Sequence, residues 1–214
     1  MVCSHCDSLN NLSQQQSDQV RYELLAYLGL FLIIVSSLIN LFLQSKRGMI
    51  ICLAIQYLGV FLLIMQAWTV GLSAVKLIAG WMAATFLGAA HLSEKEDQQQ
   101  EQQKATGVLF KISTGLFTLL VVLGSAESIR TIIPVPLVFI WSGMALICLG
   151  FLQMATTENT LKVIIGLLTT LSGFEIVYSA IENSVLVAGL ASLITMGIAL
   201  AGAYLLILPQ LEKQ

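Results

Sequence analysis

The chain has 214 residues, of which 57% are hydrophobic and only 10% are charged, and it contains only three prolines. This composition excludes an ordinary soluble domain and indicates an integral membrane protein, whose spans each need roughly 20 apolar residues. The formal net charge of −2 offers no basic field that would attract nucleic acid. We therefore expect the lipid bilayer as the surrounding medium and no nucleic-acid partner.

Residues 1–21 are polar and are expected to form a flexible tail. No basic segment precedes an apolar stretch there, so no secretory signal peptide is predicted and the first span acts as its own insertion signal. Cys3, His5 and Cys6 form a CSHC cluster that offers three zinc ligands, whereas a structural zinc site takes four. A disulfide or an incidental polar tail is the alternative. No metal or other cofactor is therefore expected.

Hydropathy predicts seven membrane spans, of which the fourth is the weakest. In chain order they are Tyr22 to Leu43, Gly48 to Ala67, Val70 to Ala90, Gly107 to Ala126, Ile133 to Ala155, Leu161 to Ile181 and Val185 to Leu208. The strongly polar segment SEKEDQQQEQQK separates the third span from the fourth and is typical of a linker. The chain is thus expected to divide into a tail (1–21), a three-helix unit (22–91), a polar linker (92–106), a connecting helix and loop (107–132), a second three-helix unit (133–208) and a short tail (209–214).

The distribution of Lys and Arg predicts the orientation of these spans, because cytoplasmic loops are enriched in both. With the N-terminus outside, the outer segments hold only Arg21 and Arg130. The inner segments hold Lys46, Arg47, Lys95, Lys104, Lys111, Lys162 and Lys213. The count favours an N-out, C-in topology.

The two halves of the sequence look related. An ungapped shift of 114 positions pairs Gly29 with Gly143, Gly59 with Gly173 and Gly88 with Gly202, and it aligns identical residues across three consecutive spans. A three-span unit enters on one face and leaves on the other, so two parallel copies need an odd number of connecting spans. The predicted fold is therefore an all-α membrane protein of about seven transmembrane helices, with two parallel three-helix repeats joined by a connecting helix.

Two ionisable residues lie inside predicted spans, Glu175 in the sixth and Lys76 in the third. Such residues are costly in a bilayer and usually face a protein interior or an ion path, so both are candidates for a proton or cation relay. The structural alternatives are that Glu175 is hydrated near the outer interface or serves assembly alone, and that Lys76 snorkels toward the headgroups. Gln56 is a further relay candidate, with an interhelical hydrogen bond as its structural alternative.

Each half resembles the small three-span K-type subunit of respiratory NADH-quinone oxidoreductase, which is similar to the C subunit of Mrp-type cation/proton antiporters and to a hydrogenase-4-type membrane subunit. The resemblance covers residues 22–90 and 136–208. It lies in a polar or basic loop, the apolar span after it and a Gly/Ala-rich third span. These segments read KRGMIICLAIQYLGVFLL with VKLIAGWMAATFLGAA, and ENTLKVIIGLLTTLSGFEIVY with GLASLITMGIALAGAYLL.

The resemblance implies buried glutamates on the second and third spans of each unit, which help protons move between larger antiporter-like subunits. In the first copy the second-span position falls near Gln56 and Tyr57, and Lys76 takes the third-span position. In the second copy the third-span position is near Leu193, and Glu175 lies about two turns beyond the second-span position. The resemblance thus implies larger membrane subunits as partners and a bacterial inner or thylakoid-type membrane as the location.

Motifs of catalysis are missing from the sequence, which has no phosphate-binding glycine loop and no pair of metal ligands on one helix. We therefore expect no enzyme, but a non-catalytic membrane subunit of a complex I-like or Mrp-like assembly that supports proton or cation translocation. A structural or assembly protein without a transport role and a stand-alone small transporter are the alternatives.

Overall fold

The computed structural model describes residues 3–43, 45–93, 105–131, 135–182 and 184–211. Side chains are described in these ranges except at 3–20, 22, 91–93, 105–109 and 209–211. The described part of the chain is helical throughout, apart from short turns between the helices.

Seven α-helices follow one another along the described part of the chain. They are α1 (Cys3–Phe42), α2 (Lys46–Ala67), α3 (Val70–Ser93), α4 (Ala105–Arg130), α5 (Leu137–Ala155), α6 (Thr160–Ile181) and α7 (Val185–Leu211). Each contains a segment of at least 19 residues that is long and apolar enough to cross a membrane, including the weakly predicted fourth. The prediction of a helical protein with seven potential spans is confirmed, and it indicates a multi-pass integral membrane protein.

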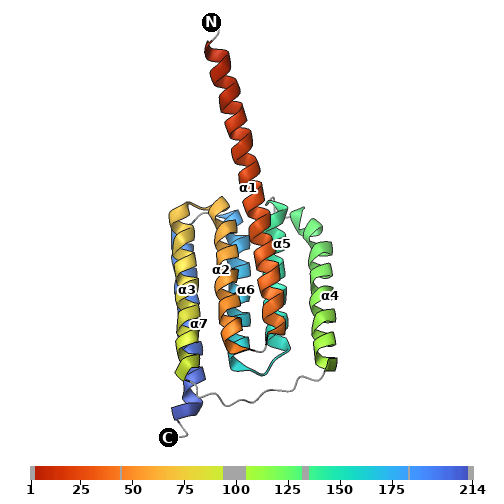
Figure 1. Ribbon diagram of the computed structural model, residues 1–214, viewed down its shortest axis with the longest axis vertical. Coiled ribbons are helices and arrows are strands. Elements are labelled where there is room, and N and C mark those ends of the chain that lie inside the picture. The colour runs from red at the N-terminus through yellow and green to blue at the C-terminus, as the bar shows by residue number, and fades with distance from the viewer. Residues whose placement is uncertain (1–2, 44, 94–104, 132–134, 183, 212–214) are drawn as a thin grey trace.

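The helices form two layers of three, with α4 at the edge (Figure 1). Helices α1, α2 and α3 lie side by side in one layer, and α5, α6 and α7 lie in the other. Across the interface α1 packs against α5, α2 against α6, and α3 against α7. Helix α4 packs mainly on α5 and is the least buried of the seven apart from the projecting part of α1. The interior between the layers is therefore built mainly from six helices.

Two helix starts differ from the predicted boundaries by more than two residues. Helix α1 begins at Cys3, so the segment expected to be a flexible polar tail is helical and extends beyond the other helices (Figure 1). Residues 3–21 contain neither Gly nor Pro, the two residues that most disfavour a helix. Helix α5 begins at Leu137, four residues later than predicted, because Pro136 disfavours the helical conformation of the residue before it. The predicted linker falls largely on residues 94–104, outside the described residues.

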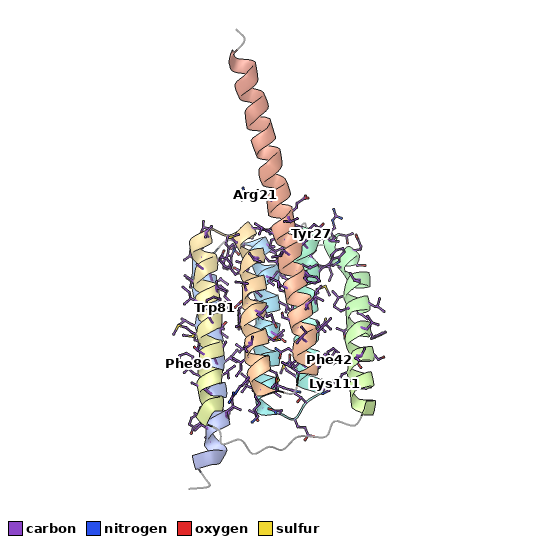
Figure 2. All side chains as sticks on the ribbon, viewed as in Figure 1. Arg21, Tyr27, Phe42, Trp81, Phe86 and Lys111 are labelled. Atoms are coloured by element: carbon purple, nitrogen blue, oxygen red, sulfur yellow. The ribbon has the colours of Figure 1, made fainter. Side chains whose placement is uncertain are left out.

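Four of the basic residues with described side chains lie at one end of the bundle. Lys46 and Arg47 open α2, Lys111 lies near the start of α4, and Lys162 lies near the start of α6. Figure 2 shows Lys111 and Phe42 toward the lower end of the bundle and Arg21 at the upper end. Arg130, in the last turn of α4, lies at the end opposite to Lys111. Among the described residues, Arg21 and Arg130 therefore lie at the end opposite to Lys46, Arg47, Lys111 and Lys162.

Paired glycines bring the helices of each layer close together. A Cβ added to Gly59 on α2 would lie 3.1 Å from the carbonyl oxygen of Gly29 on α1. A Cβ added to Gly173 on α6 would lie 2.6 Å from the carbonyl oxygen of Gly143 on α5. Small residues at such contacts allow the backbones to approach, which is the usual way helices pack in a bilayer. These contacts fix the helices that carry the polar residues described next.

Candidate functional site

A buried ion pair joins the two layers at Lys76 and Glu175. The Lys76 ammonium on α3 donates to Glu175 Oε1 on α6 at 2.5 Å. Their side chains are only 4% and 5% exposed, respectively. The sequence marked these two residues separately, on different spans, and the structure brings them into direct contact.

Thr195 on α7 completes the surroundings of the ammonium. Lys76 Nζ donates to Thr195 Oγ1 at 2.7 Å, and the Thr195 hydroxyl donates in turn to the carbonyl of Ala191 at 2.9 Å. The hydroxyl proton is thereby directed into α7 itself, so the oxygen presents its lone pairs to the ammonium. Because Lys76 is held inside the bundle by two oxygen atoms, its ammonium does not snorkel toward a headgroup region.

The second carboxylate oxygen of Glu175 has a different environment. Glu175 Oε2 is buried and accepts no hydrogen bond from the described residues. Tyr57 on α2 is 1% exposed and lies near Glu175 and Ser172. The ring of Tyr57 fills the space over Gly80 on α3, where any larger residue would meet it. In the carboxylate, Oε1 therefore accepts a hydrogen bond from Lys76, whereas Oε2 has no hydrogen-bond donor among the described residues and can take up a proton.

Gln56 does not join the ion pair. Its Nε2 donates to Thr169 Oγ1 on α6 at 3.1 Å, which makes the interhelical hydrogen bond weighed from the sequence. Thr169 precedes Glu175 by six residues, or roughly 9 Å along the helix at 1.5 Å per residue. The structure thus places Gln56 one and a half turns or more from the charged pair, between the same two layers.

Helix α6 carries a line of buried polar side chains on the face that includes Glu175. Thr169, Ser172 and Ser179 are at most 3% exposed. Their hydroxyls donate to α6 carbonyls three or four residues earlier at 2.8–2.9 Å, so their oxygens remain available as acceptors. The line therefore places buried hydroxyl oxygens along the same face of α6 as the Glu175 carboxylate.

Sequence reasoning missed the hydroxyl residues. The spacing of three or four between Thr169, Ser172, Glu175 and Ser179 is the helical repeat of one face, and it could have identified the polar line. Thr195 lies in an apolar stretch whose nearest other hydroxyl residue is Ser192. Only the packing of α7 against α3 reveals the contact of Thr195 with Lys76. Tyr57 was noted only as a neighbour of Gln56.

The candidate zinc ligands Cys3, His5 and Cys6 lie outside the residues whose side chains are described. Among the described side chains, no group of three or more His, Cys, Asp or Glu is placed to hold a metal ion. Cys52 and Cys148, the cysteines with described side chains, are both free thiols.

Comparisons with family models, with curated proteins and with solved structures find no match to this chain. The function therefore has to be argued from the buried site itself.

Proposed function

We propose that this chain is a non-catalytic membrane subunit of a complex I-like or Mrp-like assembly and supports the translocation of protons or cations. The observation that carries the proposal is the buried contact between Lys76 and Glu175 on different membrane helices. Ionisable residues at membrane depth are expensive, and those that face a protein interior typically mark an ion path or a proton relay. A protein that only filled space would be served as well by apolar side chains.

The polar line on α6 extends the proposed path away from the ion pair. From Thr169 to Ser179 it spans ten residues, or roughly 15 Å of the membrane thickness at 1.5 Å per residue. Lys162, near the start of the same helix, lies at the basic end of the bundle. Protons entering from that end would meet the hydroxyls of Thr169 and Ser172 before reaching Glu175.

We also propose that the two layers arose as two parallel copies of one three-helix unit, with the N-terminus outside and the C-terminus inside. Helices α2 and α6 begin and end 114 residues apart, at Lys46 and Thr160 and at Ala67 and Ile181. The Gly29–Gly59 contact and the Gly143–Gly173 contact are related by the same shift. This supports the pairing of α1–α3 with α5–α7, which leaves α4 as the connecting helix.

One observation favours the structural alternative. The ion pair links α3 of one layer to α6 and α7 of the other, so it also fastens the layers together. A docking role and a relay role make different predictions for variants that remain folded.

Glu175→Gln tests the proposal in the assembled complex. The relay requires a carboxylate that binds and releases a proton, so we expect ion-coupled activity to fall by at least about tenfold, the factor that corresponds to roughly 1.4 kcal/mol in a barrier. Quantitative mass spectrometry of the complex purified through a C-terminal tag would show whether the subunit is still incorporated.

The double variant Lys76→Gln/Glu175→Gln serves as the matched control, because it removes both charges and leaves none uncompensated. The relay predicts low activity in the double variant also. Normal activity in either assembled variant would reject the relay and leave the structural role. Recovery of the wild-type chain without stoichiometric partners, together with transport by that chain alone, would favour the stand-alone transporter.

A further inference from the structure

The ammonium of Lys76 is held inside the bundle by oxygen atoms of α6 and α7. It is surrounded by Glu175 Oε1 at 2.5 Å and Thr195 Oγ1 at 2.7 Å, and the side chain is 4% exposed. A carboxylate oxygen and a hydroxyl oxygen are the donor atoms that proteins offer to alkali and other hard cations. Glu175 Oε2, which no described residue satisfies, is a third oxygen of the same buried group.

We infer that Lys76 acts as a built-in cation that keeps the Glu175–Thr195 site closed to free metal ions, so that the path passes protons alone. A buried carboxylate requires a compensating positive charge. Here that charge is covalently attached to α3 and cannot diffuse away, so an alkali cation cannot replace it. The inference deepens the proposed function by naming the ion, although the cation site itself exists whether or not the assembly translocates anything.

A proton, unlike a metal ion, can pass without displacing the lysine. Along the hydrogen bond between Lys76 Nζ and Glu175 Oε1, one N–H bond breaks and one O–H bond forms, which converts an ammonium and a carboxylate into an amine and a carboxylic acid. The electron pair of the broken N–H bond stays on nitrogen, and the total charge of the pair is unchanged. Reprotonation of the amine from one side and release of the carboxylic acid proton to the other restore the ammonium and the carboxylate, so one proton has passed and no co-reactant is needed.

Removal of the Lys76 side chain should open the Glu175–Thr195 site to a free cation. Lys76→Ala keeps Cβ and removes three carbons and the ammonium, which together have the size and charge of n-propylammonium. The purified variant in detergent would be heated in the presence of n-propylammonium, Na⁺, K⁺ or choline. We expect n-propylammonium, and more weakly Na⁺ or K⁺, to raise the Tm by roughly 5–10 °C at about 100 times the dissociation constant. Choline, which is too bulky, should have no effect.

Two controls identify the site. The wild-type protein should show no such cation-dependent rise in Tm, because Lys76 already occupies the position. The variant Lys76→Ala/Glu175→Gln has the same space without the carboxylate and should not respond. If Lys76→Ala does not fold in detergent, Lys76→Gln takes its place. Glu175 is also uncompensated in that variant, so we expect Na⁺ to raise its Tm as it does that of Lys76→Ala.

The outcomes separate this inference from the proposed function. A folded Lys76→Ala or Lys76→Gln protein that no cation stabilises, or one stabilised no more than the double variant, would overturn the inference, even if Glu175→Gln still impairs ion-coupled activity. An equal rise in the wild-type protein would overturn it as well. A third outcome is that cations stabilise Lys76→Ala but neither control, while Glu175→Gln leaves the activity of the assembly unchanged. That pair of results would uphold the cation site and reject the relay.

Discussion

At the scale of single residues, the contact between Lys76 and Glu175 is the feature with the largest energetic consequence. Each charge taken from water into a low-dielectric interior costs several kcal/mol, and only the partner charge and the Thr195 hydroxyl offset that cost. A pair of this kind adds little net stability compared with an apolar pair of the same volume. It becomes strongly destabilising when one member is removed, because the other charge is then left uncompensated.

A double-variant cycle tests this coupling. We expect Lys76→Met and Glu175→Gln each to lower the free energy of unfolding by about 3–5 kcal/mol, and the combined variant to lower it by much less than the sum. Unfolding of the purified protein by a denaturing detergent in mixed micelles would measure each value. Lys111→Met, near the start of α4 at the basic end, is the matched control, with an expected change within about 0.5 kcal/mol. Additive losses would show that the two charges are not coupled.

At the scale of helices, the close approach of α5 and α6 at Gly143 and Gly173 sets the position of Glu175. The carboxylate lies two residues after Gly173, so any separation of the two backbones shifts it relative to Lys76. The neighbouring atoms are a backbone carbonyl and the Cβ of Leu146, at 2.6 and 2.8 Å from an added Cβ. Neither can move aside as the end of a flexible side chain could.

Gly173→Ala should therefore destabilise the protein by about 1–3 kcal/mol, the usual cost of forcing extra atoms into a packed interior. Gly189→Ala on α7 is the matched control, because an added Cβ there meets no atom within 4 Å. Alanine favours a helix by up to about 1 kcal/mol over glycine, so the control should be neutral or stabilising. Thermal unfolding of both purified variants would measure the difference, and equal stability of the two would contradict this account of the α5–α6 contact.

At the scale of the whole molecule, the two ends of the helix bundle differ in their basic residues. Basic residues at the starts of α2, α4 and α6 share one end. Because Lys and Arg are retained on the cytoplasmic side, this end should face the cytoplasm.

Labelling of single cysteines would check the orientation. In a chain with its four native cysteines replaced by alanine, a membrane-impermeant maleimide should label Ser128→Cys in intact cells. It should label Ser45→Cys only after the membrane is permeabilised. Both positions are exposed at helix ends, one near the end of α4 and one before α2, so they differ chiefly in side. The reverse pattern would show the opposite orientation.

Much of this architecture could be predicted from the sequence, because hydropathy reports directly on each span. All seven spans, the opposite placement of Arg21 and Lys111, and the location of Lys76 and Glu175 within spans follow from composition and periodicity. The contact between the two charges could not be predicted, since it depends on the rotation and depth of α3 against α6 and α7. The helical start of α1 was missed because the polarity of residues 3–21 suggested a tail, although nothing in that segment interrupts a helix.

The separation of Lys76 from Glu175 by 99 residues has a consequence for how the chain is made. Translation at about 5–20 residues per second leaves roughly 5–20 s between the synthesis of the lysine and that of its counter-charge. During that interval α3 has to wait with its ammonium extended toward the headgroups or shielded by the insertion machinery. Lys76 can therefore reach its final, paired position only after α6 has entered the membrane.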